Sequence, residues 1–437
     1  ACDFLLRRGA KVTISEKKRP EEIKNYLEEL AAKGAIIEAG GHQQDTFLQA
    51  DLIIPSPGVP LLKEIREAEA RDIPVFSEVE LAFRFLQGKI VGITGSNGKS
   101  TTATLIHKIL KEAGRPSFLA GNIGTPLISF IEGSRPDHIY VTELSSFQLT
   151  HTQSFKAHVG VLLNITPDHL DWHPSFIHYS AAKKKLILSL EEKDVAVLNR
   201  DDSEVWSLHS QTRADVFGFS RQHQVDKGMF IREGWIYSVF KKQNKFLKTS
   251  DIQLFGLHNQ ENVMASALAA WSLGVKVPKI RDSIQTFKGL EHRLEKVSTI
   301  EGVTFYNDSK ATNVDAALKS IQSFQQKIIP ILGGRDKGGD FSALRPFLKQ
   351  KAKAVILIGE AAEKILKELR NISILHQAHS MKEAVEKGFS LADQGDIVLL
   401  APACTSFDMF ANFEERGQCF KKEVRSLEEK ILQGNKK

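Results

Sequence analysis

One ten-residue segment constrains the fold more than any other part of the chain. It reads Gly-Ile-Thr-Gly-Ser-Asn-Gly-Lys-Ser-Thr over residues 92–101, after an apolar run at 89–93 and before a helical pattern at 100–113. A strand, a turn containing Gly-Lys-Ser and a helix, in that order, are the context of a phosphate-binding loop. Glycines such as Gly95 and Gly98 would let backbone N–H groups face phosphate oxygens, and the helix N-terminus adds partial positive charge.

Two side chains of this loop would act on the ligand directly. Lys99 would neutralise the terminal phosphates of a nucleotide, and the Ser100 hydroxyl would coordinate Mg²⁺. The glycine spacing, G-x-x-G-x-x-G-K-S, departs from the common G-x-x-x-x-G-K-[ST], so a plain glycine-rich turn is the alternative. The predicted nucleotide-binding residues of the loop are Gly95, Ser96, Asn97, Gly98, Lys99, Ser100 and Thr101.

Short apolar runs rich in Val and Ile alternate with helical patterns along the rest of the chain. Such runs are typical of parallel strands that are covered by helices on both faces. The chain is therefore predicted to belong to the α/β class. Residues 215–255 instead hold short alternating runs, which predict a small antiparallel patch inside the middle domain. Further predicted strands lie at 11–14, 51–54, 138–141, 159–163, 195–198, 328–332, 354–358 and 397–400.

The length of 437 residues is enough for two to four domains. Boundaries near 86–88 and 289–290, which are less sharply marked than the strand and helix patterns, divide the chain into three predicted domains: 1–86, 87–290 and 291–437. Residues 1–6 have the pattern of a helix interior and not of a helix start. A doubly wound domain usually opens with a strand and a glycine loop. We therefore expect that natural first residues precede the printed sequence.

Composition excludes several classes of protein. The formal charge of +6 is spread over the whole chain, without the basic stripe of a nucleic-acid-binding protein. Three scattered cysteines cannot form a disulfide framework or a Cys-x-x-Cys metal site, and they indicate a reducing compartment. No run approaches the roughly 18 apolar residues of a membrane span, and no signal peptide opens the chain. We expect a cytoplasmic protein without a membrane partner.

Three groups downstream of the loop are candidates for metal chemistry. Glu143 follows a predicted strand, where a carboxylate in a phosphate-binding fold is well placed to hold Mg²⁺. His169 could ligate a second metal near a transferred phosphate, although a buried, hydrogen-bonded core histidine is the default interpretation. The run Lys183-Lys184-Lys185 by itself indicates only a solvated basic face.

The chain resembles the Mur ligases, the ATP-dependent amide-forming enzymes of peptidoglycan synthesis. Segments 402–408 and 412–417, with Ser-Ser-Phe-Gln at 145–148, are similar to the member that joins D-glutamate to UDP-N-acetylmuramoyl-L-alanine. The resemblance covers nearly the whole chain. The family's motifs occur in order at 95–101, 143–148, 164–171, 256–259 and 307–313.

The resemblance implies a fold and a reaction. The fold would comprise a Rossmann-like UDP-binding domain, a central ATPase-type domain with the phosphate-binding loop, and a Rossmann-like C-terminal domain that receives the amino acid. The UDP-linked carboxylate would attack the γ-phosphate of ATP, and the amine would then attack the acyl phosphate. The products would be amide, ADP and phosphate. The resemblance further implies a cytoplasmic monomer without a nucleic-acid partner.

It also implies the metal site. Ser100 and Glu143 would hold one Mg²⁺ and His169 would lie near a second. Lys183 matches a lysine that is carbamylated in the family, which would turn an ammonium into an anion able to ligate Mg²⁺; Lys184 is the less favoured register.

The resemblance assigns the remaining site residues. Asn122 would steer the carboxylate of the muramoyl substrate, and the turn containing Ser56 and Gly58 would lie near the UDP group. The expected ATP ligands beyond the loop are Asn259, Asn262, Arg293 and Asp308. The other expected substrate-binding residues are Ser145, Lys310, Thr312, Lys337, Ser406 and Phe407, of which Thr312, Lys337, Ser406 and Phe407 would bind D-glutamate.

Other interpretations stay open. Gly333-Gly334 could be only a tight turn, and Ser406 only a helix cap. Another Mur ligase or a folylpolyglutamate synthetase would share the mechanism, although the chain lacks the Asp-Asn-Pro-Arg sequence of the diaminopimelate-adding enzyme. A nucleotide-regulated binding module would bind ATP without turnover.

Overall fold

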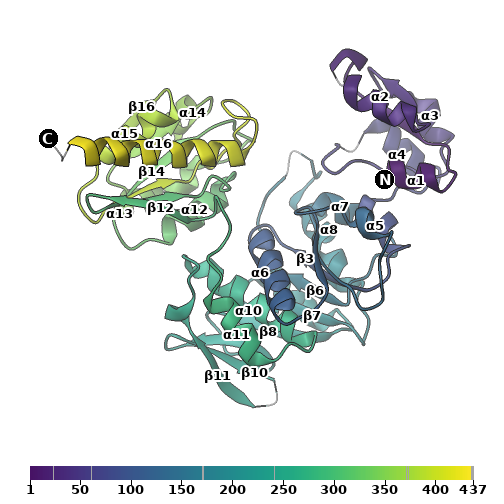
Figure 1. Ribbon diagram of the computed structural model, residues 1–437, viewed down its shortest axis with the longest axis horizontal. Helices are drawn as coiled ribbons and strands as arrows, with labels where there is room; N and C mark the ends of the chain where they lie inside the picture. The colour runs from purple at the N-terminus through teal and green to yellow at the C-terminus, as the bar shows by residue number, and fades with distance from the viewer. Residues whose placement is uncertain are drawn as a thin grey trace. The chain divides into compact units, whose positions relative to one another are not determined.

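The fold was analysed in a computed structural model that describes residues 1–22, 24–60, 62–169, 172–240, 242–370, 372 and 374–434. Its strands form three separate sheets (Figure 1). The chain divides into two compact units, one of residues 1–246 and 263–283 and the other of residues 247–262 and 284–437. Within the described residues, no helix combines the length and the apolar character needed to cross a bilayer.

The first sheet contains two parallel strands and lies near the N-terminus. Phe47, Ile65 and Ala68, from two helices that follow the sheet, form a small core of their own. The predicted strand at 51–54 is wrong, because only Ile53 forms a single bridge there, to Val75. Prolines at 55 and 57 lack N–H donors and cannot extend a ladder. The elements are α1 (Cys2–Arg7), β1 (Thr13–Glu16), η1 (Pro20–Glu22), α2 (Lys24–Ala32), β2 (Ile36–Ala39), α3 (Gln44–Leu48) and α4 (Lys63–Glu69).

The second sheet has nine strands in the order β11-β10-β9-β8-β7-β6-β3-β5-β4. All residues of β5 and β6 are buried, as are all but the first of β3, which agrees with their apolar sequences. Helix α6 packs on β3, β4 and β5, and α8 packs on β3 and β6. The strands are β3 (Lys89–Thr94), β4 (Ser117–Gly121), β5 (Ile139–Glu143), β6 (Val159–Leu162), β7 (Val195–Asn199), β8 (Asp215–Ser220), β9 (Gly228–Arg232), β10 (Trp235–Val239) and β11 (Gln243–Lys248).

The helices of this region follow or separate those strands. They are α5 (Glu78–Phe83), α6 (Lys99–Glu112), η2 (Leu127–Phe130), α7 (Ser146–Thr150), α8 (Phe176–Leu188), α9 (Ser203–Trp206), η3 (Ser207–Ser210), η4 (Thr249–Asp251), α10 (Leu257–Ser272) and α11 (Val277–Gln285). The predicted helix at 100–113 is therefore present, one residue earlier, as α6.

The predicted antiparallel patch at 215–255 is only partly correct. β8 pairs in parallel with β7, and β9 in parallel with β8, so these strands extend the main sheet. β9 and β10 form an antiparallel pair. Its two-residue turn, Glu233-Gly234, has positive φ angles of 53° and 73°, as a hairpin of type I′ requires.

The third sheet has six strands in the order β12-β13-β17-β14-β15-β16, and β12–β13 is its antiparallel pair. Figure 1 shows α15 and α16 side by side on this sheet. The carboxyl ends of β13, β14 and β17 meet at one edge, where ligands bind in doubly wound sheets. The elements are β12 (Glu295–Ile300), β13 (Val303–Asn307), α12 (Val314–Gln322), β14 (Ile328–Gly333), η5 (Phe341–Leu344), α13 (Arg345–Lys351), β15 (Val355–Ile358), α14 (Ala362–Glu368), β16 (Leu375–Ala378), α15 (Met381–Ser390), β17 (Ile397–Leu400) and α16 (Phe413–Gly434).

Candidate active site

The predicted phosphate-binding loop joins β3 to α6 and requires glycine at two positions. Gly95 has a φ of 153°, and a Cβ there would lie 3.1 Å from the Leu163 Cβ and 3.3 Å from the Asn164 nitrogen. Gly98 precedes α6 with a φ of 89°. The backbone can therefore curl closely around the start of the helix, which is the geometry that cradles an anion.

Asn164 and Ser96 fix the shape of this loop. The Asn164 side chain accepts from the Asn97 nitrogen at 2.8 Å and donates to the Asn97 oxygen at 3.1 Å. The Ser96 hydroxyl donates to the Thr166 oxygen at 2.9 Å and accepts from the Thr166 nitrogen at 2.9 Å. The segment after β6 thus supports the loop, a role of Asn164 that the sequence did not indicate.

Two lysine side chains meet at one backbone oxygen of the loop. Lys99 Nζ donates to the oxygens of Gly95 and Ser96, both at 2.9 Å. Lys183 Nζ donates to the same Gly95 oxygen at 2.8 Å and lies over the ring of Tyr179, 4.8 Å from its centroid. Lys183 comes from α8 and is only 2% exposed.

Burial lowers the pKa of Lys183 well below that of an ordinary lysine, and the charge of Lys99 lowers it further. The carboxylates of Asp168 and Glu143 act in the opposite direction. The lowered pKa favours a neutral, nucleophilic amine. The adjacent Lys184 instead points to Glu204 and forms an ion pair of 2.6 Å.

Glu143 ends β5 and is 2% exposed. Asn122 donates from its side chain to Glu143 Oε1 at 2.8 Å and from its backbone to the Glu143 oxygen at 2.9 Å. The structure thus brings together a predicted metal ligand and the residue predicted to steer the substrate carboxylate. A Cβ at Gly121 would lie 2.3 Å from the Glu143 oxygen, so a glycine is needed at this approach.

His169 lies in the loop after β6, with a φ of 52°. Its backbone nitrogen donates to Asp168 Oδ1 at 2.9 Å, and its ring packs edge-on against Phe147 with centroids 4.8 Å apart. His173 Nε2 lies 2.9 Å from the Ser146 hydroxyl, which joins this loop to α7. The last residues of the predicted motif, Leu170 and Asp171, lie outside the described residues.

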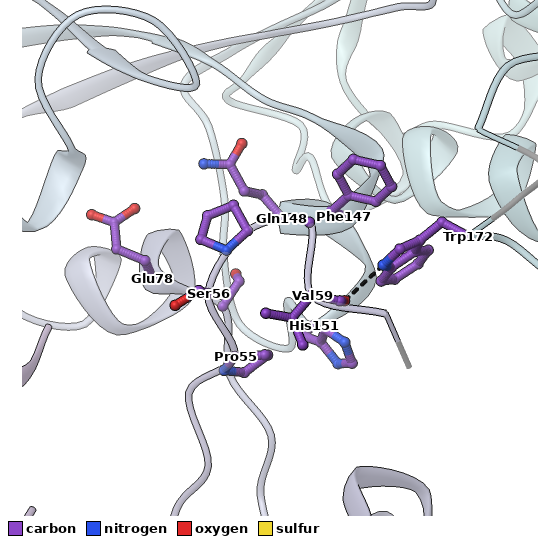
Figure 2. A pocket seen from close by; sticks show the side chains of 11 residues that line it. Pro55, Ser56, Val59, Glu78, Phe147, Gln148, His151 and Trp172 are labelled. Atoms are coloured by element: carbon purple, nitrogen blue, oxygen red, sulfur yellow. Dashed lines mark hydrogen bonds between the residues drawn. The ribbon is translucent and has the colours of Figure 1, made fainter. Parts of the chain in front are cut away.

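A small pocket lies beside this loop (Figure 2). Ser56 and Gly58 line it from the N-terminal region, and Trp172 Nε1 donates to the Val59 oxygen at 2.7 Å across it. Ser145 caps α7 in a reciprocal arrangement with Gln148, so its observed contacts are structural. The other lining residues are Pro55, Pro57, Ser77, Glu78, Phe147, Gln148 and His151.

The donor set of the first unit fits a hard divalent cation once a further anion is supplied. In the part of the chain that the structure describes, no group of three or more His, Cys, Asp and Glu side chains is arranged to hold a metal. Mg²⁺ prefers oxygen ligands, which Ser100 and Glu143 offer. The buried amine of Lys183 would add a carboxylate-like ligand if it were carbamylated.

The second unit holds the other predicted nucleotide ligands. Asn262 donates to Asn259 Oδ1 at 2.9 Å near the start of α10, and both side chains are buried. Burial raises the pKa of Asp308 to about 6, while a hydrogen bond from Ser320 and the charge of Arg293 oppose the rise. Arg293 and Asp308 are therefore close enough to interact electrostatically.

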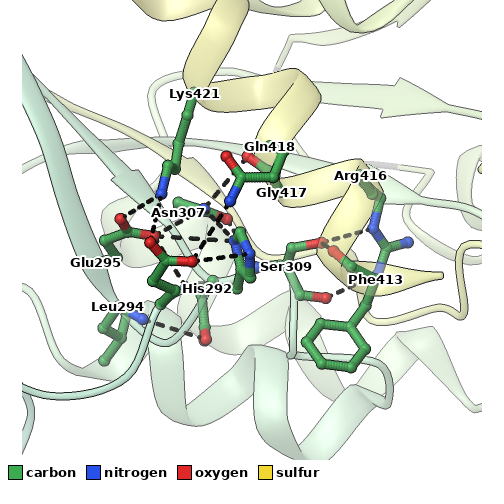
Figure 3. Close-up of polar contacts among 12 residues, drawn as sticks. His292, Leu294, Glu295, Asn307, Ser309, Phe413, Arg416, Gly417, Gln418 and Lys421 are labelled. Carbon is green, nitrogen blue, oxygen red and sulfur yellow. Dashed lines mark hydrogen bonds and ion pairs between the residues drawn. The ribbon is translucent and has the colours of Figure 1, made fainter.

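Arg416 organises the edge of the third sheet and was not predicted from the sequence (Figure 3). Its guanidinium is buried and donates to the Ser309 hydroxyl at 3.0 Å and the Ser309 oxygen at 2.8 Å. It also donates to the oxygens of Cys404 and Thr405, both at 3.1 Å. One side chain thus joins the loop after β13 to the loop after β17. Arg416 lies in the first turn of α16, and nothing in the sequence around it indicates these partners.

The predicted amino-acid ligands lie on the loops at this edge. Lys310 places its ammonium 3.7 Å from the ring centroid of Phe413, and the Thr312 nitrogen donates to the Lys310 oxygen. Ser406 is buried, whereas Phe407 is 60% exposed and Lys337 is exposed. The structure therefore places Phe407 at the surface of the unit.

The close approach of the chain at Gly333-Gly334 requires glycine. A Cβ at Gly333 would lie 1.8 Å from the Ile358 oxygen, and its φ is 126°. Gly333 is the last residue of β14 and Gly334 lies in a bend, so the pair allows the chain to pass close to the end of β15.

Three family models match successive parts of the chain. The family described as "Mur ligase MurD-like, N-terminal domain" matches residues 1–77, "Mur ligase middle domain" matches 93–270 and "Mur ligase, glutamate ligase domain" matches 292–404.

Relatives match over nearly their whole length. A UDP-N-acetylmuramoylalanine--D-glutamate ligase from Koribacter versatilis is 42% identical over 98% of this chain and 95% of the relative. The ligase of the same name from Acidobacterium capsulatum is 46% identical over 96% and 92%. Among solved structures, MurF from Thermotoga maritima in complex with ADP has a TM-score of 0.63 at 18% identity, covering 95% of this chain and 98% of that one. UDP-N-acetylmuramate-alanine ligase MurC from the same organism has a TM-score of 0.60 at 18% identity, covering 97% and 95%.

Proposed function

The chain belongs to the Mur ligase family, and on that premise we propose that it joins D-glutamate to UDP-N-acetylmuramoyl-L-alanine with conversion of ATP to ADP and phosphate. The observation that carries the choice of amino acid is the identity of 41–46% to D-glutamate ligases over nearly the full chain. It acts in peptidoglycan synthesis.

The reaction has two chemical steps. A carboxylate is a poor electrophile because its leaving group would be oxide. An oxygen of the L-alanyl carboxylate attacks the γ-phosphorus of ATP, the bond to the β-phosphate oxygen breaks and ADP leaves. The D-glutamate nitrogen then attacks the acyl carbon, a proton is lost from nitrogen, and phosphate departs with one former carboxylate oxygen.

Residues of the first unit act on the phosphates and on the reacting acid. The loop N–H groups and Lys99 hold the β- and γ-phosphates, because positive charge is needed where negative charge gathers. Asn122, held against Glu143, orients the carboxylate. Ser100, Glu143 and His169 would hold Mg²⁺, which would neutralise phosphate charge. We propose two such ions.

Lys183 completes the metal site as a carbamate. Its neutral amine attacks carbon dioxide, the nitrogen loses a proton, and the product is an anionic carbamate at the same position. The burial of Lys183 and the nearby Lys99 support this step because both lower the pKa of the amine. The ion pair of Lys184 with Glu204 supports the choice of Lys183.

Residues of the second unit bind the nucleotide and the amino acid. Asn259, Asn262, Arg293 and Asp308 contact ATP. Lys337 meets one carboxylate of D-glutamate as a point charge. Lys310, Thr312, Ser406 and Phe407 complete the amino-acid site. Ser56, Gly58 and Ser145 lie toward the UDP-linked substrate.

We also propose the domain boundaries 1–86, 87–290 and 291–437 and a cytoplasmic monomer. The three separate sheets support the division into domains. The free state of all three cysteines is consistent with a reducing compartment.

An amino-acid panel tests the function. ADP release is measured with ATP, Mg²⁺ and UDP-N-acetylmuramoyl-L-alanine, adding D-glutamate, L-glutamate, L-alanine or L-lysine in turn. Release that is at least about tenfold faster with D-glutamate is expected, since a site built for two carboxylates in one configuration excludes the others. Equal release with L-alanine or L-lysine would reject the assignment, and nucleotide binding without turnover would indicate a binding module.

A further inference from the structure

A turn at the edge of the third sheet presents Lys337 at its apex. The turn follows β14 and runs from Asp336 to Gly339. Asp336 Oδ1 accepts a hydrogen bond from the Gly339 nitrogen at 2.9 Å, which closes it. Lys337 and Gly338 between them are exposed, and Gly338 has a φ of 84°.

Lys364, from α14, ties the two ends of this turn together. Its Nζ donates to Asp336 Oδ2 at 2.6 Å and to the Gly339 oxygen at 2.9 Å. The same ammonium lies 5.2 Å from the ring centroid of Phe341, which follows the turn. One cation therefore contacts the first residue, the last residue and the exit of the turn.

The residue before the turn is anchored to the same region. Arg335 forms a bidentate ion pair with Glu360, with both N···O distances 3.0 Å. Its backbone exchanges hydrogen bonds of 3.0 Å with Thr405, the residue before Ser406. Arg335 thus has a structural partner, and the turn is held between α14 and the loop after β17.

We propose that Lys364 is a positioning residue that sets the affinity for the incoming amino acid by holding the turn that carries Lys337. The proposal rests on the function proposed for Lys337. A lysine ammonium can move only as far as its four-carbon stem reaches, so the position of the backbone limits where its charge can lie. Loosening the turn would reduce attraction for a carboxylate but leave the phosphate-binding loop unchanged.

The test compares two lysines with matched contacts. Lys387, on α15, also donates to one carboxylate, Glu383 at 2.6 Å, and to one carbonyl, Gln377 at 2.6 Å. The side chains of Lys364 and Lys387 are 41% and 38% exposed. The variants Lys364→Met and Lys387→Met therefore remove similar interactions from the same domain, and only the first touches the turn.

Steady-state kinetics give the main readout. We expect Lys364→Met to raise KM for the amino acid about tenfold, with kcat and the KM for ATP within about threefold of the unsubstituted protein, because a binding contact is lost rather than a transition-state contact. Lys364→Arg should restore most of the affinity, since a guanidinium can also reach the carboxylate and the carbonyl. Lys387→Met should leave all three values unchanged.

Hydrogen exchange supplies a readout independent of catalysis. Amide exchange of residues 336–341 should accelerate in Lys364→Met and not in Lys387→Met. Should Lys364→Met not fold, Asp336→Asn removes the same ion pair and is expected to raise KM for the amino acid in the same way.

The outcomes separate this proposal from the proposed function. The amino acid that reacts fastest in the panel is used throughout, so failure of the D-glutamate assignment appears only in the panel. An unchanged KM in Lys364→Met, or an equal rise in Lys387→Met, would overturn the proposal. A rise of KM for the amino acid in Lys364→Met but not in Lys337→Met would also overturn the proposal. Lys364 would then act through a group other than Lys337.

Discussion

Lys99 and Lys183 donate to the same acceptor, the backbone oxygen of Gly95, at 2.9 and 2.8 Å. Two ammonium groups this close would repel each other strongly in a site of low dielectric. Because Lys183 is the more deeply buried of the two, burial and the charge of Lys99 lower its pKa and disfavour its charged form. A neutral amine can take up carbon dioxide, and the resulting carbamate would face Lys99 as an opposite charge.

The first prediction concerns the lysine run on α8. Lys183→Ala should lower kcat by about a thousandfold or more, because it removes an anion from the metal site. A small carboxylic acid such as acetate should restore part of the activity. Lys184→Ala is the matched control; it loses only the partly exposed ion pair with Glu204 and should stay within about threefold of full activity.

The carbamate can also be observed directly. Protein equilibrated with ¹³C-labelled bicarbonate should show one carbamate carbon resonance that is absent from Lys183→Ala. If the resonance is lost in Lys184→Ala and kept in Lys183→Ala, the carbamate lies on Lys184.

The second prediction concerns the loop glycine. Gly95→Ala combines a strained φ of 153° with contacts of 3.1 and 3.3 Å from the added methyl group. We expect ATP affinity, measured by calorimetry, to fall at least about tenfold, because the backbone donors move from the phosphates. Gly133→Ala also has a positive φ, 86°, but open space around it, and it should bind ATP normally. Equal affinities for the two variants would show that the close approach is unimportant.

Much of the fold could be predicted because its signals are local. Buried parallel strands are short apolar runs, so β3, β5, β6, β7, β14, β15 and β17 lie within one or two residues of the predicted positions. The phosphate-binding loop was visible because glycine, lysine and serine must occur at fixed spacing. The strand predicted at 51–54 is wrong because an apolar run does not indicate whether a partner strand is available.

The remaining features depend on contacts between distant segments. Lys183 read as part of a solvated run, and only the family resemblance assigned it another role; its burial follows from how α8 packs. Arg416 and Lys364 look like ordinary helix cations in the sequence. Their partners lie 107 and 28 residues away, and no spacing rule relates them.

The third prediction concerns acid stability of the first unit. Burial lowers the pKa of His151 to about 4 from 6.5. The folded state therefore binds fewer protons than the unfolded state between these values. The stabilisation is present above pH 6.5 and is lost as the pH falls through 6.5 toward 4, by at most about 3 kcal/mol.

All four tryptophans, Trp172, Trp206, Trp235 and Trp271, lie in this unit, so fluorescence-detected urea unfolding reports on it. His151→Gln should flatten the pH dependence between 6.5 and 4. If His151→Gln loses as much stability between pH 6.5 and 4 as the unsubstituted protein does, groups other than His151 cause the loss.

The fourth prediction concerns Arg416. Arg416→Met removes four hydrogen bonds from a buried guanidinium and leaves carbonyl oxygens without their donor, so the second unit should lose about 3 kcal/mol of stability. Arg425→Met, at an exposed position of the same helix, should change it by less than about 0.5 kcal/mol. Amide hydrogen exchange of residues 303–309 and 397–405 measures the stability of the second unit in both variants. Similar protection in the two variants would contradict this role.

Transfer of an oxygen atom from the substrate carboxylate to phosphate is the signature of the acyl-phosphate step. UDP-N-acetylmuramoyl-L-alanine labelled with ¹⁸O in its carboxylate is turned over with ATP and D-glutamate, and the released phosphate is analysed by mass spectrometry. We expect one ¹⁸O atom in each phosphate formed from fully labelled substrate. Phosphate without label, released together with amide product, would contradict the acyl-phosphate step.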